Sequence, residues 1–303
     1  MHTIQERLSL PEPSLLADDL CDFIRRIVQK EEKNGCVIGN SGGVDSALVA
    51  AMAVRALGKE HVHLFFLPER DTHKNSRRDA ILVAKNLGLK MRTINITSIL
   101  RKLGVYRLEP LLYFFPRSVV ERSLREKRKE INDKEGSAFL QMQRGGNDPK
   151  LLRDIAYCCI KNRVRMSILY LHAELKNCLV LGTTNQSEKM LGLYAKYGDG
   201  ACDLAPLDGL YKTQVFDLAR YMGVPAGIID KPPTGDLCPG SDDEEVLNLG
   251  YAQIDRILAG LELGLPDDTI ARDGVSQSDL DYLRNLISAS ESKRRNFYTP
   301  NIV

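Results

Sequence analysis

The sequence lacks the features that mark a secreted, membrane-bound or strongly charged protein. Its 303 residues carry 42 Lys and Arg against 40 Asp and Glu, a formal net charge of +2. This balance gives no reason to expect a nucleic-acid or membrane surface. No segment approaches the roughly 20 apolar residues that cross a bilayer, and the N-terminus lacks an apolar stretch of signal-peptide length. We therefore expect a cytoplasmic protein that binds neither nucleic acid nor membranes.

Metal-binding patterns of cysteine and histidine are also lacking. The seven cysteines form no CxxC pair and lie in apolar segments, which favours buried, reduced thiols. The five histidines show no metal-ligand spacing. His61 and His63 share a face of a predicted strand, but a partly exposed strand end explains them as well as a metal would. A zinc site is not expected.

Short apolar runs alternate with helical patterns through most of the chain. Strands are predicted at 36–38, 61–67, 91–96 and 178–181, with helices at 47–57, 76–88 and 151–176. The second helix is expected to start in a capping box formed by Ser76 and Asp79. Alternation of this kind predicts an α/β fold, a doubly wound parallel sheet with helices on both faces. Ligands bind such sheets beyond the carboxyl ends of the strands, where residues 39–47, 68–70 and 182–185 fall.

Residues 117–135 break this alternation because they are dense in charges of both signs. Glu121 with Arg125, and Glu130 with Lys134, have the i,i+4 spacing that supports an exposed helix. A solvated helix followed by a mobile loop at 145–147 is one interpretation. An active-site lid or a partner-binding arm is the other.

The stretch GNSGGVDSA at 39–47 predicts a phosphate-binding loop after the first strand. No lysine follows the glycines, so it is not a Walker A loop. Ser41, Gly42 and Gly43 can expose successive backbone N–H groups, and Ser46 opens a helix whose start favours an anion. Asp45 would repel a phosphate unless a cation lay between them. Asp45 therefore predicts Mg²⁺.

A second carboxylate should share that ion, and Glu188 is the best candidate. It follows the predicted strand 178–181 by seven residues, in the segment GTTNQSE. On spacing alone, stabilisation of a helix start is the better explanation of a single Glu in this position.

SGGVDS after a strand resembles the loop of the N-type ATP pyrophosphatases, which split ATP between its α and β phosphates. Five further segments make the resemblance more specific: NRVRM at 162–166, GTTNQSE at 182–188, KYGDGACD at 196–203, LYKTQ at 210–214 and KPPTGDL at 231–237. In this order they are similar to the ammonia-dependent NAD synthetases. The resemblance covers about 15–100 and 150–295 and leaves the charged segment outside. It implies a Rossmann-like fold of the adenine-nucleotide alpha-hydrolase type, as one domain over 1–303 with a charged helical insertion at about 105–150.

The resemblance also implies a role for particular residues. ATP would be bound by Gly39, Asn40, Ser41, Gly42, Gly43, Val44, Asp45, Ser46, Thr183, Lys212 and Thr234. Asp45 and Glu188 would bind Mg²⁺, and Arg163, Lys196, Asp203 and Lys293 would bind deamido-NAD. Lys212 begins a helical pattern, so its charge can reach the α-phosphate as pyrophosphate departs.

The implied reaction has two steps. The carboxylate of deamido-NAD attacks the α-phosphorus of ATP to give an acyl adenylate, and ammonia then displaces AMP to leave NAD. Asp236 is our candidate for capturing and deprotonating ammonium, with ordinary loop capping as an equal alternative. Glutamine-dependent relatives carry a glutaminase domain before the synthetase, and the stretch before Gly39 leaves no room for one. Free ammonia or a separate protein should supply the nitrogen, and the family suggests a homodimer with the site at its interface.

The chain departs from the family where a His-Lys pair usually contacts deamido-NAD. Ser292 and Lys293 stand there, so only the lysine contact carries over. Rival interpretations remain an ATP pyrophosphatase with another acceptor, such as a tRNA-thiolating or GMP-amidating enzyme, and a nucleotide-binding regulator without catalysis. A tRNA-thiolating enzyme should show reactive cysteine pairs or a basic extension, and a GMP-amidating enzyme should show a guanine-site C-terminal domain. Neither is evident in the sequence. The regulator should have lost Asp45 or Glu188, and both are present.

Overall fold

The computed structural model describes residues 3–108, 119, 122, 123, 126, 137–234, 242–272, 274–295 and 297–299. Within them, one parallel sheet has four strands in the order β3-β2-β1-β4. The strands are β1 (Cys36–Gly39), β2 (Val62–Phe66), β3 (Met91–Thr93) and β4 (Leu179–Leu181). β1 pairs with β2 on one side and with β4 on the other. The strands β2 and β3 therefore extend the sheet on one side of β1, and β4 extends it on the other side. The loops after β1 and β4 therefore share one edge of the sheet.

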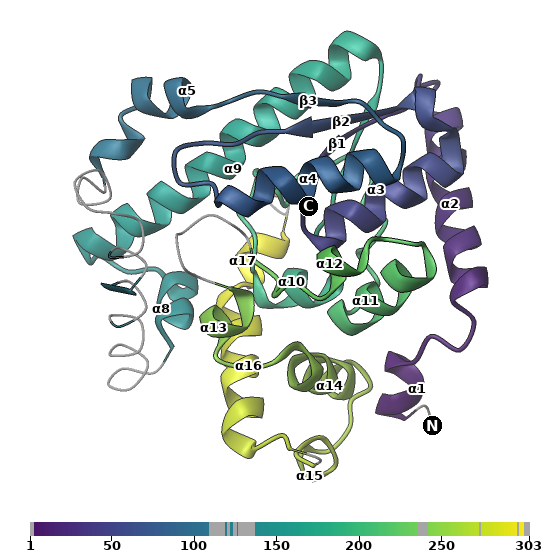
Figure 1. Ribbon diagram of the computed structural model, residues 1–303. Helices are drawn as coiled ribbons and strands as arrows, with labels where there is room; N and C mark the ends of the chain where they lie inside the picture. Colours follow the sequence, from purple (N-terminus) through teal and green to yellow (C-terminus); the bar gives the residue numbers. More distant parts are fainter. Residues whose placement is uncertain are drawn as a thin grey trace.

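Helices account for most of the remaining described chain (Figure 1). The longer ones are α2 (Pro13–Lys30), α3 (Val44–Leu57), α4 (Lys74–Asn86), α9 (Pro149–Lys176), α11 (Lys212–Tyr221), α14 (Tyr251–Glu262) and α16 (Gln277–Ala289). The shorter ones are α1 (Ile4–Leu8), α5 (Thr97–Lys102), α8 (Ala138–Arg144), α10 (Gln186–Leu191), α12 (Ala226–Ile229), α13 (Asp243–Leu247), α15 (Asp267–Ile270) and α17 (Glu291–Arg294), with 3₁₀ turns η1 (Lys59–His61) and η2 (Val105–Arg107).

β1, β2 and β4 contribute apolar side chains to both faces of the sheet, whereas β3 contributes only Met91 to one of them. On one face, Cys36 and Ile38 of β1 join a core that includes α2, α3, α4 and α11. On the other face, Val37 of the same strand joins a second core with α5 and α9. Strands that are buried on both sides are typical of parallel sheets, which explains why their sequences are continuous apolar runs.

A third apolar cluster lies beside this sandwich and is built from helices. Residues of α1, α8, α10, α13, α14, α15 and α16 form it, and α14, α15 and α16 lie together at the bottom of Figure 1. Arg7 of α1 reaches Glu262 at the end of α14, with Nη2 and Oε2 3.2 Å apart. The N-terminal helix is thereby attached to a part of the chain more than two hundred residues away.

These elements confirm the doubly wound parallel sheet with helices on both faces. One local prediction is wrong: α4 begins at Lys74, and its N-cap is His73, whose Nδ1 accepts a hydrogen bond from the backbone of Asn75. Ser76 and Asp79 therefore lie inside the helix. Most of the charged segment 117–135 falls outside the described residues. In the part that the structure describes, no helix has both the length and the apolarity needed to cross a membrane.

Candidate active site

The glycine loop is held in shape by its own side chains and by α4. Asn40 is buried; its Nδ2 donates to the carbonyl of Ala80 at 2.9 Å, and its Oδ1 accepts from the backbone N–H of Gly42 at 3.2 Å. Gly42 has φ +81°, and a Cβ there would lie 2.8 Å from the backbone oxygen of Ser76. Only glycine combines this backbone conformation with so close an approach. The loop then leads directly into α3, whose N-terminal N–H groups favour an anion.

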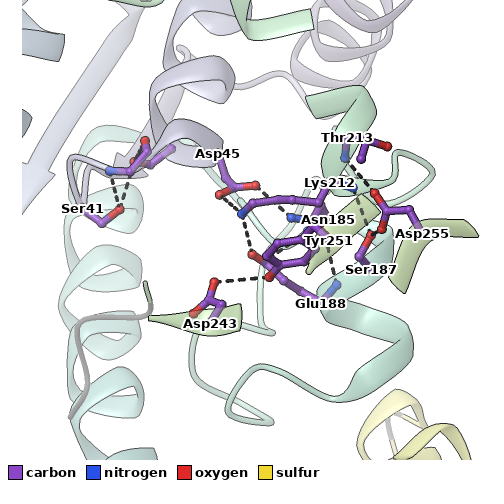
Figure 2. A network of polar contacts seen from close by, with 12 residues as sticks. Ser41, Asp45, Asn185, Ser187, Glu188, Lys212, Thr213, Asp243, Tyr251 and Asp255 are labelled. Atoms are coloured by element: carbon purple, nitrogen blue, oxygen red, sulfur yellow. Dashed lines mark hydrogen bonds and ion pairs between the residues drawn. The ribbon is translucent and has the colours of Figure 1, made fainter. Parts of the chain in front are cut away.

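Lys212 connects the two predicted metal ligands. Its Nζ lies 2.7 Å from Oδ2 of Asp45 and 3.0 Å from Oε1 of Glu188, and only 1% of its side chain is exposed. Figure 2 shows the lysine between the two carboxylates. Asp45 comes from the first turn of α3, Glu188 from α10 and Lys212 from the first position of α11. Three residues that the sequence suggested on separate grounds therefore form one cluster.

Further polar side chains hold Asp45 and the start of α11 in place through hydrogen bonds. Asn185 donates from Nδ2 to Oδ1 of Asp45 at 2.8 Å. The hydroxyl of Ser187 donates to Oδ1 of Asp255 at 2.5 Å and accepts from the backbone N–H of Lys212 at 3.0 Å. The other oxygen of Asp255 accepts from the N–H of Thr213 at 2.8 Å. This network orients the start of α11 and so positions the lysine (Figure 2).

Burial and three neighbouring carboxyl groups shift the pKa values in this cluster. Burial raises the pKa of Glu188 to about 8, against the attraction of Lys212 and with further repulsion from Asp45 and Asp243. Burial alone would lower the pKa of Lys212, but the charges of Asp45 and Glu188 outweigh burial and raise it. The lysine therefore remains protonated, and Glu188 ionises less readily than an ordinary Glu until a further cation joins the cluster.

Magnesium bound to a phosphate fits these residues better than a metal held by protein alone. Asp45 and Glu188 lie close enough together that one oxygen of each contacts the same atom, Nζ of Lys212, at 2.7 and 3.0 Å. No group of three or more His, Cys, Asp or Glu in the described parts of the chain is arranged to hold a metal. Mg²⁺ is usually held by one or two carboxylates, with waters and substrate phosphates completing its shell.

A cavity of about 350 Å³ lies in front of this cluster. Its walls include the glycine loop, the ends of β2 and β4, one side of α9, part of α8 and the segment 231–234. Thr183 and Thr234, which the resemblance assigned to ATP, and Lys293, which it assigned to deamido-NAD, also line it. The cavity thus brings most of the predicted ATP residues together with one predicted dinucleotide residue.

The other predicted deamido-NAD residues lie outside the lining of this cavity. Nε of Arg163 donates to the backbone oxygen of Lys196 at 3.1 Å, and Nζ of Lys196 donates to that of Ser292 at 2.8 Å. Asp203 accepts from the hydroxyl of Tyr170 at 3.2 Å and from the N–H of Val180 at 2.7 Å. In this structure these three side chains make contacts within the chain. Asp236, the candidate for handling ammonium, lies outside the described residues.

The charged residues after β2, at positions 69–71, form a buried network with α9 and do not line the cavity. Nζ of Lys161, on α9, lies 3.2 Å from Oε1 of Glu69 and 2.9 Å from Oδ2 of Asp71. The lysine side chain is fully buried. Tyr157, one turn earlier on α9, donates its hydroxyl to Asp71. Glu69, which the sequence placed near the ligand edge, and the neighbouring Asp71 therefore attach this loop to α9.

Several members of the site were not predicted from the sequence. Asn185 and Ser187 lie inside the quoted segment GTTNQSE, so only their side-chain roles were missed. Asp243 lines the cavity and accepts a hydrogen bond from the hydroxyl of Tyr251 at 3.2 Å. Asp255 is fully buried on α14. An aspartate in the apolar stripe of a helix was the one available signal, because a buried carboxylate requires partners.

A glycine loop, a carboxylate pair and a buried lysine at the carboxyl edge of a parallel sheet define a Rossmann-like protein of the nucleotide-binding class. A family described as NAD synthase matches residues 16–108 and 117–297. The chain therefore belongs to the NAD synthase family. The family match includes residues from 117 onward, so the charged segment is not outside the family as the sequence resemblance suggested.

Individual relatives agree with this assignment. The NH(3)-dependent NAD(+) synthetase of Thermotoga maritima is 41% identical over 283 residues, covering 92% of this chain and 97% of that protein. A solved NMN synthetase from Francisella tularensis has a TM-score of 0.71 at 26% identity, over 96% of this chain and 99% of that one. The NH3-dependent NAD synthetase from Campylobacter jejuni has a TM-score of 0.68 at 28% identity, over 97% and 100%. The family expected from the sequence is confirmed.

Proposed function

We propose that the protein is an ammonia-dependent NAD synthetase, a ligase that uses ATP to convert the carboxylate of deamido-NAD into an amide. The observation that carries this proposal is the contact of Lys212 with both Asp45 and Glu188 at the glycine loop. A buried cation between two carboxylates, next to backbone donors for phosphate, suits a reaction that separates pyrophosphate from ATP. We further propose that residues 1–303 form one synthetase domain, as the resemblance suggested.

ATP is assigned to the cavity with its phosphates on the loop from Gly39 to Ser46. Thr183 and Thr234, which line the same cavity, complete the predicted contacts. Asp45 and Glu188 would hold Mg²⁺, which supplies positive charge between phosphate oxygens when it is bound. Repulsion from Asp45 and Asp243 contributes to the raised pKa of Glu188, and a bound cation would relieve it, which supports this assignment.

In the first step, a carboxylate oxygen of deamido-NAD attacks the α-phosphorus, and the bond from that phosphorus to the bridging oxygen breaks. The nucleophile is already an anion, so the site needs to orient the reactants and neutralise charge rather than remove a proton. Lys212 is assigned to the α-phosphate, where its ammonium group stabilises the negative charge that develops as pyrophosphate leaves.

In the second step, the nitrogen of ammonia attacks the acyl carbon, and the bond to the AMP oxygen breaks. Ammonium must first lose a proton, and Asp236 remains our candidate for accepting it. Replacing Asp236 by Ala should reduce amidation more than adenylate formation. The measurement is the ratio of pyrophosphate to NAD released; an unchanged ratio would count against this role.

Deamido-NAD is assigned to Arg163, Lys196, Asp203 and Lys293, with Lys293 reaching the cavity. Arg163 and Asp203 are exposed, which is consistent with a site completed by a second copy of the chain. We therefore propose a homodimer with the dinucleotide site at its interface. The cytoplasmic location expected from the sequence stays a prediction.

The test is an assay of the purified chain with ATP, Mg²⁺, deamido-NAD and an ammonium salt. NAD and AMP should form in equal amounts, and the activity should be lost with EDTA. Nicotinate mononucleotide is the comparison acceptor, because one structural relative is an NMN synthetase. A strong preference for the mononucleotide would replace the proposed acceptor, and no amide product with either acceptor would refute the function.

A further inference from the structure

The glycine loop contains no basic side chain of its own. In a Walker A loop a lysine next to the glycines reaches the outer phosphates. Here the corresponding region ends in Asp45, which adds a negative charge. If ATP binds at this loop, as the proposed function requires, positive charge for its outer phosphates has to come from another part of the chain.

Four basic side chains line the cavity among the described residues: Arg165, Lys212, Lys231 and Lys293. Lys212 is held by two carboxylates. Nε of Arg165 donates to the backbone oxygen of Leu67 at 3.1 Å, on the α9 wall. Nζ of Lys293 donates to the backbone oxygens of Gly192 at 2.8 Å and Tyr194 at 3.0 Å. Lys231 is the remaining cation.

Lys231 lies beside the glycine loop. Its Nζ is 3.2 Å from Oδ2 of Asp79, a buried residue of α4, and its side chain is 24% exposed. Asp79 packs directly behind the loop, because a Cβ at Gly42 would lie 3.0 Å from the Cβ of Asp79. The ammonium group is therefore held next to the part of the loop that has the positive φ.

The local charge balance favours an anion at this point. Asp79 also accepts from Arg78, whose Nη2 lies 3.3 Å from Oδ1. Arg78, Asp79 and Lys231 together carry one net positive charge. The side chain of Arg78 is 75% exposed, and Arg78 is not part of the cavity lining. Lys231 is thus the member of this group that faces the cavity.

We propose that Lys231 binds the outer phosphates of ATP, and the pyrophosphate produced from them, in place of the lysine that the loop lacks. Asp79 pairs with the amine before the nucleotide enters, and the phosphates then compete with Asp79 for it. This role lies beyond the ATP contacts assigned above and depends on ATP being bound at the glycine loop.

The test measures Mg²⁺-pyrophosphate binding by calorimetry on the full chain, together with KM for ATP and for deamido-NAD. Lys231→Met should weaken pyrophosphate binding and raise KM for ATP about tenfold or more, because a charge-assisted hydrogen bond to a phosphate is lost. KM for deamido-NAD should change less than about twofold, and Lys231→Arg should restore most of the loss.

Two further variants separate phosphate binding from a structural role of the ion pair. Asp79→Asn breaks the same pair but leaves the lysine, so pyrophosphate affinity should be kept or improved. Arg78→Gln removes the exposed partner of Asp79 and should leave pyrophosphate affinity unchanged. Thermal unfolding of each variant shows whether the fold is intact.

Two results would overturn the inference: pyrophosphate binding by Lys231→Met equal to that of the unmodified chain, or an equal loss in Asp79→Asn. Both leave the proposed function standing, since the unmodified chain would still form NAD. An unmodified chain that binds no pyrophosphate and forms no NAD would refute the proposed function itself.

Discussion

Lys212 and Asp45 are 167 positions apart in the sequence, yet Nζ of the lysine lies 2.7 Å from Oδ2 of the aspartate. The sheet order explains the meeting, because β1 and β4 are neighbours and the loops that follow them share one edge. Asp45 follows β1 through the glycine loop, and α11 follows β4 through residues 182–211. The contact therefore depends on the topology of the whole sheet.

Lys212→Met should destabilise the protein by about 3 kcal/mol, because it leaves the carboxylates of Asp45 and Glu188 without their cation. Mg²⁺ should restore more stability to this variant than to the unmodified chain, since the ion meets a larger excess of negative charge. Urea unfolding with Mg²⁺ and with EDTA measures both effects. Equal stabilisation of the two proteins by Mg²⁺ would contradict the assignment of the ion to these carboxylates.

Lys161→Met should destabilise the protein by about 3–5 kcal/mol, because Glu69 and Asp71 would remain buried without their shared cation. The matched control is Lys189→Met. Its pair with Asp208 is as short, at 2.7 Å, but both side chains are more than a third exposed, so its loss should cost less than about 1 kcal/mol. Denaturant unfolding gives the two values, and similar losses would show that the buried network contributes little.

The stability that Asp71 contributes should disappear in acid. Burial would raise the pKa of Asp71, but hydrogen bonds from Arg70 and Tyr157 and the charge of Lys161 lower it to about 2. The folded pKa is below that of the unfolded chain, about 3.9, so the contribution of about 2 kcal/mol is complete above about pH 5 and is lost as the pH falls toward 2. The difference in unfolding free energy between the unmodified chain and Asp71→Asn should shrink over this range. A difference that stays constant from pH 5 to pH 2 would show that Asp71 keeps an ordinary pKa.

Gly42→Ala should weaken ATP binding and destabilise the fold by more than about 2 kcal/mol. A left-handed backbone alone costs an alanine about 1–2 kcal/mol, and the new Cβ would also collide with the backbone of Ser76 and Ala80 at 2.8 Å. Gly104→Ala is the control, because Gly104 has φ +77° but nothing within 4 Å of a Cβ. Thermal unfolding and KM for ATP should separate the two. Equal effects would mean that the contact with α4 is unimportant.

The sheet and the two metal-ligand candidates were accessible from the sequence for physical reasons. Strands buried on both faces are short continuous apolar runs, and Val37 and Ile38 illustrate this because they are fully buried on opposite faces. Ligands of such sheets bind at the loops that follow the strands, and Asp45 and Glu188 were predicted as site residues because they lie in two of these loops or just after them. The predicted start of α4 failed because Ser76 and Asp79 imitate a capping box, whereas the cap is the side chain of His73.

Other parts of the site depend on packing between distant elements. Asp255 meets Ser187 only because α14 packs against α10, and no local pattern joins residues 68 positions apart. Lys161 lies on a long helix whose sequence does not distinguish a buried lysine from a solvated one. Its burial follows from the position of α9 over the loop after β2, where two carboxylates are available as partners.

The single carboxylate of Glu188 serves two purposes at once. Its Oε2 accepts the N–H of Asn185 in the capping box of α10, while its Oε1 accepts from Lys212. Because α10 has only six residues, its first turn is a large part of the helix. Glu188→Gln keeps a side chain suited to the capping box but removes the charge, so natural variation there could preserve the helix and silence the enzyme. Helix formation and ligand affinity therefore place different demands on the same position: the capping box accepts an amide, whereas the contact with Lys212 requires the charge.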